Sequence, residues 1–208
     1  MILAPQLWLS QIICAIRMCD ISTFKDYILS VLKACLIGVL LSVYGATADT
    51  ISGRFELVDH RGNLVTQSSY NDQLRLVFFG FTRCPIICPT TMSEISKVMF
   101  LLEHRANQVK PIFISIDPEH DTVQTVADYI SVFHPSVVGL TGTAEQVKQA
   151  AEGFNVTYGR GPVNSLDEAE EIFHTSYLYL MDREGKLLDV IGYGTRPALI
   201  LEKLEQHL

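Results

Sequence analysis

Residues 74–89 read LRLVFFGFTRCPIICP, and this stretch decides the fold. Residues 74–81 are almost continuously apolar, which is typical of a central strand covered on both faces in an α/β sheet. Cys84 and Cys88 follow, and a helical pattern starts at Pro89. We expect Pro89 at the first helical position, where its missing N–H breaks no hydrogen bond. The stretch therefore predicts a strand, a cysteine-containing loop and a helix.

Working outward from this stretch, apolar strands alternate with amphipathic helical patterns. The expected elements are a strand over 54–59, helices over 89–108, 122–133, 144–154 and 196–208, a strand over 111–116, and a hairpin built from 175–181 and 186–192. Strands that alternate with helices imply a parallel core, and the late hairpin adds antiparallel strands. This order predicts a thioredoxin-like mixed α/β sheet flanked by helices, with an N-terminal strand extension and an inserted helix.

The first 48 residues differ from the rest of the chain. Residues 34–46, ACLIGVLLSVYGA, form a short apolar run that follows Lys25 and Lys33 and precedes Ala46-Thr47-Ala48. This is the pattern of a secretory signal peptide, and the run is shorter than a membrane span needs. We therefore expect residues 1–48 to be a signal peptide cleaved near Ala48, or else a retained membrane anchor, and residues 49–208 to form the folded domain. Met18 is an alternative start.

Charge excludes one class of function. The whole chain has a net charge of −7, and the first 48 residues contribute three Lys or Arg against two Asp, so the domain itself is more acidic still. An acidic domain without a basic stripe is a poor binder of nucleic acid. The acidic run Asp167, Glu168, Glu170 and Glu171 is expected to be a solvated face rather than a ligand set.

Five cysteines are present, and three of them, Cys14, Cys19 and Cys35, fall in the N-terminal segment. The domain keeps only Cys84 and Cys88. A disulfide between these two would close a very small loop and would stabilise the fold by only about 2 kcal/mol. The pair is therefore better interpreted as reactive or metal-binding than as a structural link.

The two cysteines lie between a strand and a helix, where sites form in open α/β sheets. The helix N-terminus favours thiolate over thiol, so we expect both sulfurs to be unusually anionic. Two thiolates are soft ligands that select Cu(I), zinc or an iron–sulfur cluster. His174, just before 175–181, is the leading candidate for a third ligand, although a purely structural role stays open. Asp117 ends a buried strand and is expected to orient the ligands, whereas Asp121 is expected to cap the next helix.

Taken together, FFGFTRCPIICPTTM (78–92), IFISIDPEHDTVQTVADYISVFHP (112–135), GLTGT (139–143) and HTSYLYLMDREGKLL (174–188) resemble the Sco/SenC family of copper chaperones. The resemblance covers the whole expected domain. It implies a thioredoxin-like fold with Cu(I) or Cu(II) bound by Cys84, Cys88 and His174. It also implies a role in maturing the binuclear copper centre of cytochrome c oxidase, by delivering copper or by reducing the cysteines of that centre.

The implied partners are cytochrome c oxidase subunit II or another copper client, and a thiol reductant such as an exported thioredoxin. The implied location is the periplasm, free or anchored to the inner membrane. Two positions depart from the family pattern, because Ile86 and Phe173 stand where an aspartate is usual. The alternative function is an exported thiol–disulfide oxidoreductase that uses Cys84 and Cys88 as a redox disulfide pair. Such enzymes usually carry CxxC and a cis-proline, and this chain has neither motif.

Overall fold

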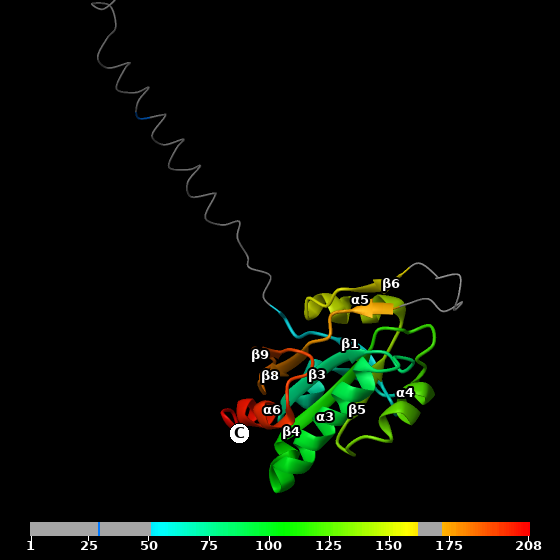
Figure 1. The fold of residues 1–208 in the computed structure, drawn as a ribbon. Helices are drawn as coiled ribbons and strands as arrows, with labels where there is room; N and C mark the ends of the chain where they lie inside the picture. Colours follow the sequence, from blue (N-terminus) through cyan, green and yellow to red (C-terminus); the bar gives the residue numbers. More distant parts are fainter. Residues whose placement is uncertain (1–28, 30–50, 162–171) are drawn as a thin grey trace, which may run out of the picture. The chain divides into compact units, whose positions relative to one another are not determined.

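The computed structural model describes Leu29, residues 51–161 and residues 172–208 (Figure 1). The chain divides into two units, residues 1–50 and residues 51–208, and the second unit holds the fold and the candidate site. The predicted signal peptide or anchor and the acidic run from Asp167 to Glu171 lie outside the described residues. No helix in the described part of the chain is long and apolar enough to cross a membrane.

A seven-stranded mixed sheet forms the centre of the domain, in the order β2-β1-β5-β4-β3-β8-β9. Its strands are β1 (Glu56–Asp59), β2 (Leu64–Thr66), β3 (Leu74–Gly80), β4 (Val109–Ser115), β5 (Val138–Thr141), β8 (Leu178–Met181) and β9 (Leu187–Ile191). β3, β4 and β5 run parallel, whereas β8 pairs antiparallel with both β3 and β9. The predicted parallel core and late hairpin are confirmed, and β1 forms the expected N-terminal extension by pairing antiparallel with β5.

Four α-helices flank this sheet: α3 (Ile87–Leu102), α4 (Val123–Ile130), α5 (Ala144–Gly153) and α6 (Pro197–Glu205) (Figure 1). Short 3₁₀ helices span Gln67–Tyr70 and Glu103–Gln108. α3 packs against α6, α4 packs against β5, and α5 packs against β1. The thioredoxin-like α/β architecture expected from the order of elements is confirmed.

The central strand β3 is buried along its whole length, as its apolar sequence predicts. Successive side chains of a strand point to opposite faces. Phe79 therefore meets Phe154 and Tyr179, with ring centroids 5.2 and 6.3 Å away, whereas Phe78 lies 6.5 Å from Phe113 on the other face. Both faces of the sheet thus carry an aromatic core.

The start and the end of the helix after the cysteines differ from expectation. α3 begins at Ile87, so Pro89 is its third residue and Cys88 lies inside the first turn. Proline is tolerated there because the N–H groups of the first turn have no partner within the helix. α3 ends at Leu102, because Glu103 takes a positive φ of 51° that an α-helix cannot continue through.

Four short strands were not predicted. β2 and β5 belong to the main sheet, and β6 (Tyr158–Arg160) pairs with β7 (Ile172–His174) in a separate two-stranded sheet. Strands of three or four residues are too short to show a clear alternating pattern. Because β7 was not predicted, His174 was expected at the end of a loop, whereas it is the last residue of this strand.

Candidate metal centre

Cys88 is completely buried against the end of the central strand. The residue beneath it is Gly80, and a Cβ atom added at Gly80 would lie only 2.8 Å from Cys88 Sγ. Glycine therefore leaves the space that the sulfur occupies. The short loop from β3 to α3 fixes this arrangement, because the first turn of α3 sits directly over the carboxyl end of β3.

The structure places His174 beside this sulfur. Cys88 Sγ lies 3.8 Å from His174 Nε2, although the two residues are 86 positions apart in the chain. His174 Nδ1 lies 3.0 Å from the carbonyl oxygen of Thr175, and because a carbonyl only accepts, Nδ1 carries the proton. The lone pair of Nε2 therefore faces the sulfur and can accept a hydrogen bond from the Cys88 thiol. Metal-binding histidines commonly show this arrangement, in which the second ring nitrogen donates to a backbone carbonyl.

Two phenylalanines hold the imidazole in place. The rings of Phe78 and Phe81 contact His174 edge-on, at centroid distances of 6.2 and 6.0 Å. Burial among these rings lowers the pKa of His174, and the hydrogen bond to Thr175 opposes this only in part. The imidazole is thus neutral at pH 7, which is the form that binds a metal.

Cys84 is only half-buried and lies at the edge of this pair. Its sulfur accepts a hydrogen bond of 3.4 Å from the backbone N–H of Cys88, and both cysteines are free thiols. Across the described residues, no three His, Cys, Asp or Glu side chains lie close enough to form a ready-made metal site. The structure therefore brings Cys88 and His174 together directly, and the Cys88 backbone N–H links the Cys84 sulfur to them.

The expectation that both sulfurs are unusually anionic is wrong for Cys88. Burial raises the pKa of the Cys88 thiol, and the hydrogen bond involving the Phe81 backbone only partly counters this. Desolvation of a fully buried thiolate raises the pKa by more than the helix N-terminus lowers it, because the effect of a helix N-terminus is modest. Cys88 is therefore a protonated thiol at neutral pH in the metal-free protein.

Asp117 is fully buried at the end of β4 and joins several parts of the site. Its carboxylate accepts from Arg83 Nη2 at 2.7 Å and from Arg160 Nη2 at 2.9 Å, and it lies 3.0 Å from His120 Nδ1. Arg83 precedes Cys84, and Arg160 ends β6, the strand that pairs with β7. Asp117 thus links the cysteine loop to the small sheet that carries His174. Sequence analysis missed both arginines, because no local pattern marks them.

Asp121 has a different role from the predicted one. Thr122, not Asp121, caps α4, since its side chain accepts from the N–H of Thr125. The Asp121 carboxylate accepts instead from the Thr82 N–H at 3.0 Å, from the Thr82 hydroxyl at 2.6 Å and from Ser115 Oγ at 2.6 Å. Asp121 therefore anchors the start of the cysteine loop to β4.

A cleft of about 620 Å³ opens over the cysteine loop and His174. It is lined by Phe81, Arg83, Cys84, Pro85, Ile86, Ile87, Ile172, Phe173, His174 and Ser176. The two positions that depart from the Sco/SenC pattern both lie here: Ile86 is 66% exposed and Phe173 is 53% exposed. The lining of the cleft is therefore mostly apolar.

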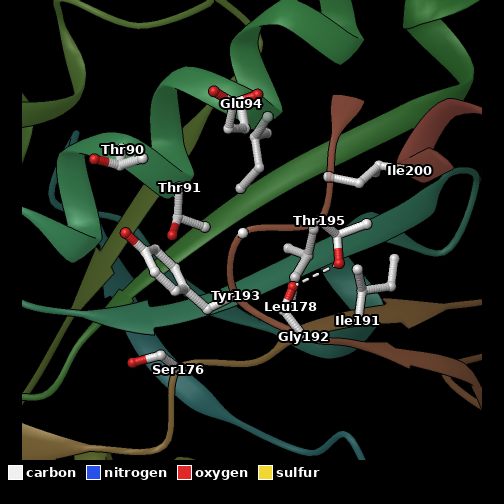
Figure 2. Close-up of a pocket in the computed structure, with 12 residues that line it drawn as sticks. Thr90, Thr91, Glu94, Ser176, Leu178, Ile191, Gly192, Tyr193, Thr195 and Ile200 are labelled. Atoms are coloured by element: carbon white, nitrogen blue, oxygen red, sulfur yellow. Dashed lines mark hydrogen bonds between the residues drawn. The ribbon is translucent and has the colours of Figure 1, made fainter. Parts of the chain in front are cut away.

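A second, much smaller hollow lies between α3 and the turn after β9. Figure 2 shows Thr90, Thr91 and Glu94 of α3 on one side and Tyr193 and Ile200 among the residues of the other. Its volume is about 30 Å³, which suffices for water but not for a larger ligand. The Thr195 hydroxyl donates to the Gly192 carbonyl at 2.8 Å and closes the turn (Figure 2). This hollow is a packing seam, so the cleft over the cysteines remains the candidate site.

Comparison with known proteins identifies relatives of this chain. The SCO1/SenC family model matches residues 44–208. A SCO2-like protein of Rickettsia felis is 36% identical over 155 residues, which cover 74% of this chain and 76% of the relative. The human mitochondrial SCO1 homolog is 37% identical over 160 residues, which cover 76% of this chain and 53% of that protein.

Solved structures agree with this result. Bradyrhizobium japonicum ScoI with copper bound superposes with a TM-score of 0.69 at 35% identity, covering 76% of this chain and 99% of that one. Yeast Sco1 with copper bound superposes with a TM-score of 0.69 at 31% identity, covering 76% of this chain and 88% of that one. The chain belongs to the SCO1/SenC family.

Proposed function

We propose that this protein binds copper through Cys84, Cys88 and His174 and delivers it to, or matures, the binuclear copper centre of cytochrome c oxidase. The observation that carries the proposal is the contact of 3.8 Å between Cys88 Sγ and the unprotonated Nε2 of His174. Two sulfurs and one imidazole form a donor set that suits copper. The copper-bound structures of Bradyrhizobium japonicum ScoI and yeast Sco1 support the same choice of metal.

In this proposal the three ligands have different tasks. The buried Cys88 and the partly buried His174 form the floor of the site, and Cys84 would turn toward them when the ion binds. Cys88 loses its proton to solvent at that step, so copper binding releases protons. Because Cys84 lines the open cleft, incoming ligands of a client can reach the ion from that side. Copper is thus cargo that passes from these ligands to those of the client.

The client is cytochrome c oxidase subunit II or another copper protein. Ile86 and Phe173 present exposed apolar surface at the cleft, so the client surface around its own ligands is expected to be apolar as well. A thiol reductant such as an exported thioredoxin would keep Cys84 and Cys88 reduced. Residues 1–48 would export the domain to the periplasm or anchor it to the inner membrane facing the periplasm.

A thiol–disulfide oxidoreductase is the second candidate function. One observation favours it: Cys84 is half-exposed and its sulfur accepts from the Cys88 N–H, so the two free cysteines lie side by side. An accessible thiol that attacks and a buried thiol that resolves are the requirements of disulfide exchange. This reaction makes no use of His174, whereas copper binding does.

The test is an anaerobic copper titration of the purified protein. We expect the wild type to bind one Cu(I) and Cys88→Ser to lose tight binding. His174→Ala should weaken Cu(I) binding only in part and Cu(II) binding far more, because Cu(II) prefers a nitrogen donor. His104→Ala is the matched control, since His104 is exposed on a 3₁₀ helix.

Cu(II) binding is followed by sulfur-to-copper charge-transfer absorption, and disulfide reductase activity is measured in parallel. Wild-type copper affinity in Cys88→Ser would refute the site. Unchanged Cu(II) spectra in His174→Ala, together with reductase activity that depends on both cysteines, would favour the oxidoreductase.

A further inference from the structure

The small sheet that carries His174 is separate from the sheet that positions the cysteines. In the described part of the chain, β6 (Tyr158–Arg160) and β7 (Ile172–His174) pair with each other and not with any strand of the seven-stranded sheet. Two strands without further support are only marginally stable in water. Backbone pairing therefore does not fix the position of His174 relative to Cys88, and side-chain contacts have to do so.

Arg160 and His174 project from the same face of this small sheet. Tyr158 pairs with His174 across the two strands, and Arg160 lies two residues beyond Tyr158 on the same strand. Because side chains alternate along a strand, all three belong to one face, whereas Gly159 and Phe173 belong to the other. Two residues of a strand span about 7 Å, so Arg160 and His174 can attach the sheet to the domain at two separate points.

Both points of attachment are occupied. At one of them, His174 Nε2 lies 3.8 Å from Cys88 Sγ. At the other, Arg160 Nη2 donates at 2.9 Å to the Asp117 carboxylate and at 2.9 Å to the Glu119 carboxylate. Arg160 carries the only permanent charge of the two strands. Because the Asp117 side chain is completely buried, this ion pair is screened less by solvent and salt than a pair at the surface.

Asp117 gives the small sheet a fixed point of reference. Its backbone N–H donates to Ser115 Oγ at 3.1 Å, at the end of β4 in the parallel core. Its Oδ2 accepts from Arg83, the residue before Cys84, and its Oδ1 accepts from Arg160. One carboxylate thus holds both the cysteine loop and the sheet that carries the histidine. Because Arg83 still pairs with Asp117 when Arg160 is replaced, the buried carboxylate keeps a partner and the domain should still fold.

We propose that Arg160 is a positioning residue for the metal centre: its ion pair with Asp117 holds the small sheet where His174 Nε2 reaches an ion bound to Cys88. This inference rests on the proposed function. Arg160 acts through His174 and need not touch the ion. A positive charge near a bound copper ion by itself weakens binding. Removal of Arg160 therefore lowers copper affinity if Arg160 positions His174, and raises the affinity if the arginine acts only through its charge.

The test compares three variants in copper titrations of the purified protein. Arg160→Leu removes the donors, and its Cu(II) affinity should fall about tenfold with a shifted sulfur-to-copper charge-transfer band. Its Cu(I) affinity should fall less, because two sulfurs still hold that ion. Arg160→Lys should retain most of the affinity, since one nitrogen, Nη2, makes both contacts and an ammonium can replace it. Arg105→Leu is the matched control and should behave like wild type, because it breaks an ion pair with Glu205 beyond the other end of α3.

Two further measurements separate positioning from a general loss of stability. In metal-free Arg160→Leu, amide hydrogen exchange should be faster at residues 158–160 and 172–174 and unchanged in the main sheet. In a His174→Ala background, Arg160→Leu should cause no further loss of Cu(II) affinity, because the residue that it positions is already absent.

Each contrary outcome is distinct. Wild-type or higher Cu(II) affinity in Arg160→Leu, with a wild-type protein that binds copper through His174, would overturn the inference and leave the proposed function standing. Additive losses in the double variant, or faster exchange throughout the domain, would show that Arg160 only stabilises the fold, and would overturn the inference too. A wild-type protein that binds no copper would overturn the proposed function itself and this inference with it.

Discussion

Gly80 gives the sharpest test of how closely the fold is built around the Cys88 sulfur. In Gly80→Ala, the new Cβ would lie 2.8 Å from Cys88 Sγ, 3.0 Å from the Phe113 ring and 3.1 Å from the Phe78 ring. Ordinary contact starts at 3.4 Å, so the sulfur would have to move by about 0.6 Å. Metal–ligand distances tolerate only about 0.2 Å, so the site should lose much of its affinity.

The loss of folding stability in Gly80→Ala can be bounded as well. Adding a methyl group to a packed core costs about 1–3 kcal/mol. A domain of this kind has a free energy of unfolding of about 5–15 kcal/mol, so Gly80→Ala should still fold. Gly192→Ala is the matched control, because nothing lies within 4 Å of the Cβ position there.

Urea unfolding measures the stability of both variants, and competition with a Cu(I) chelator under anaerobic conditions measures their affinity. We expect Gly80→Ala to unfold at lower urea concentration and to bind Cu(I) at least about tenfold more weakly, and Gly192→Ala to match wild type in both. If Gly80→Ala kept both wild-type stability and wild-type affinity, the close contact between Gly80 and the sulfur would have no consequence and the reasoning would fail.

Two other predictions concern acid stability and the N-terminus. Burial raises the pKa of Asp117, but hydrogen bonds from His120 and Arg83 outweigh it and leave the pKa below the usual 3.8. The carboxylate therefore stabilises the fold above pH 3.8, and this stability is lost as the pH falls toward the lower folded pKa. Urea unfolding from pH 7 to pH 3 should show that Asp117→Asn is less stable than wild type at pH 7 and loses less stability in acid. Asp72→Asn, at an exposed position, is the control and should behave like wild type. If the free energy of unfolding of Asp117→Asn fell with pH in parallel with that of wild type, the prediction would be wrong. Mass spectrometry of the natively expressed protein should find cleavage near Ala48, whereas intact chains found only in membranes would indicate an anchor.

Local sequence patterns determined most of the secondary structure around the site. The run of β3 (Leu74–Gly80), which is apolar except for Arg75, predicted a buried central strand, because a strand covered on both faces is mostly apolar. Pro197 at the start of α6 and the turn between β8 and β9 were likewise predictable. The Cys84–Cys88 spacing at a strand-to-helix junction marked the site, since strand ends are where such sites form.

The tertiary structure alone decided the geometry of this candidate site. The contact between Cys88 and His174 spans 86 positions and depends on β7 pairing with β6, two strands too short for a sequence pattern. The protonation of Cys88 reversed the local expectation, because desolvation depends on which distant segments cover the sulfur, whereas the helix N-terminus is visible in the sequence. The hydrogen bonds by which Asp117 and Asp121 link distant segments follow from the same cause, and so does the finding that Thr122 rather than Asp121 caps α4. Local sequence patterns encode backbone conformation, but burial and long-range hydrogen bonds arise only when distant segments of the chain pack together.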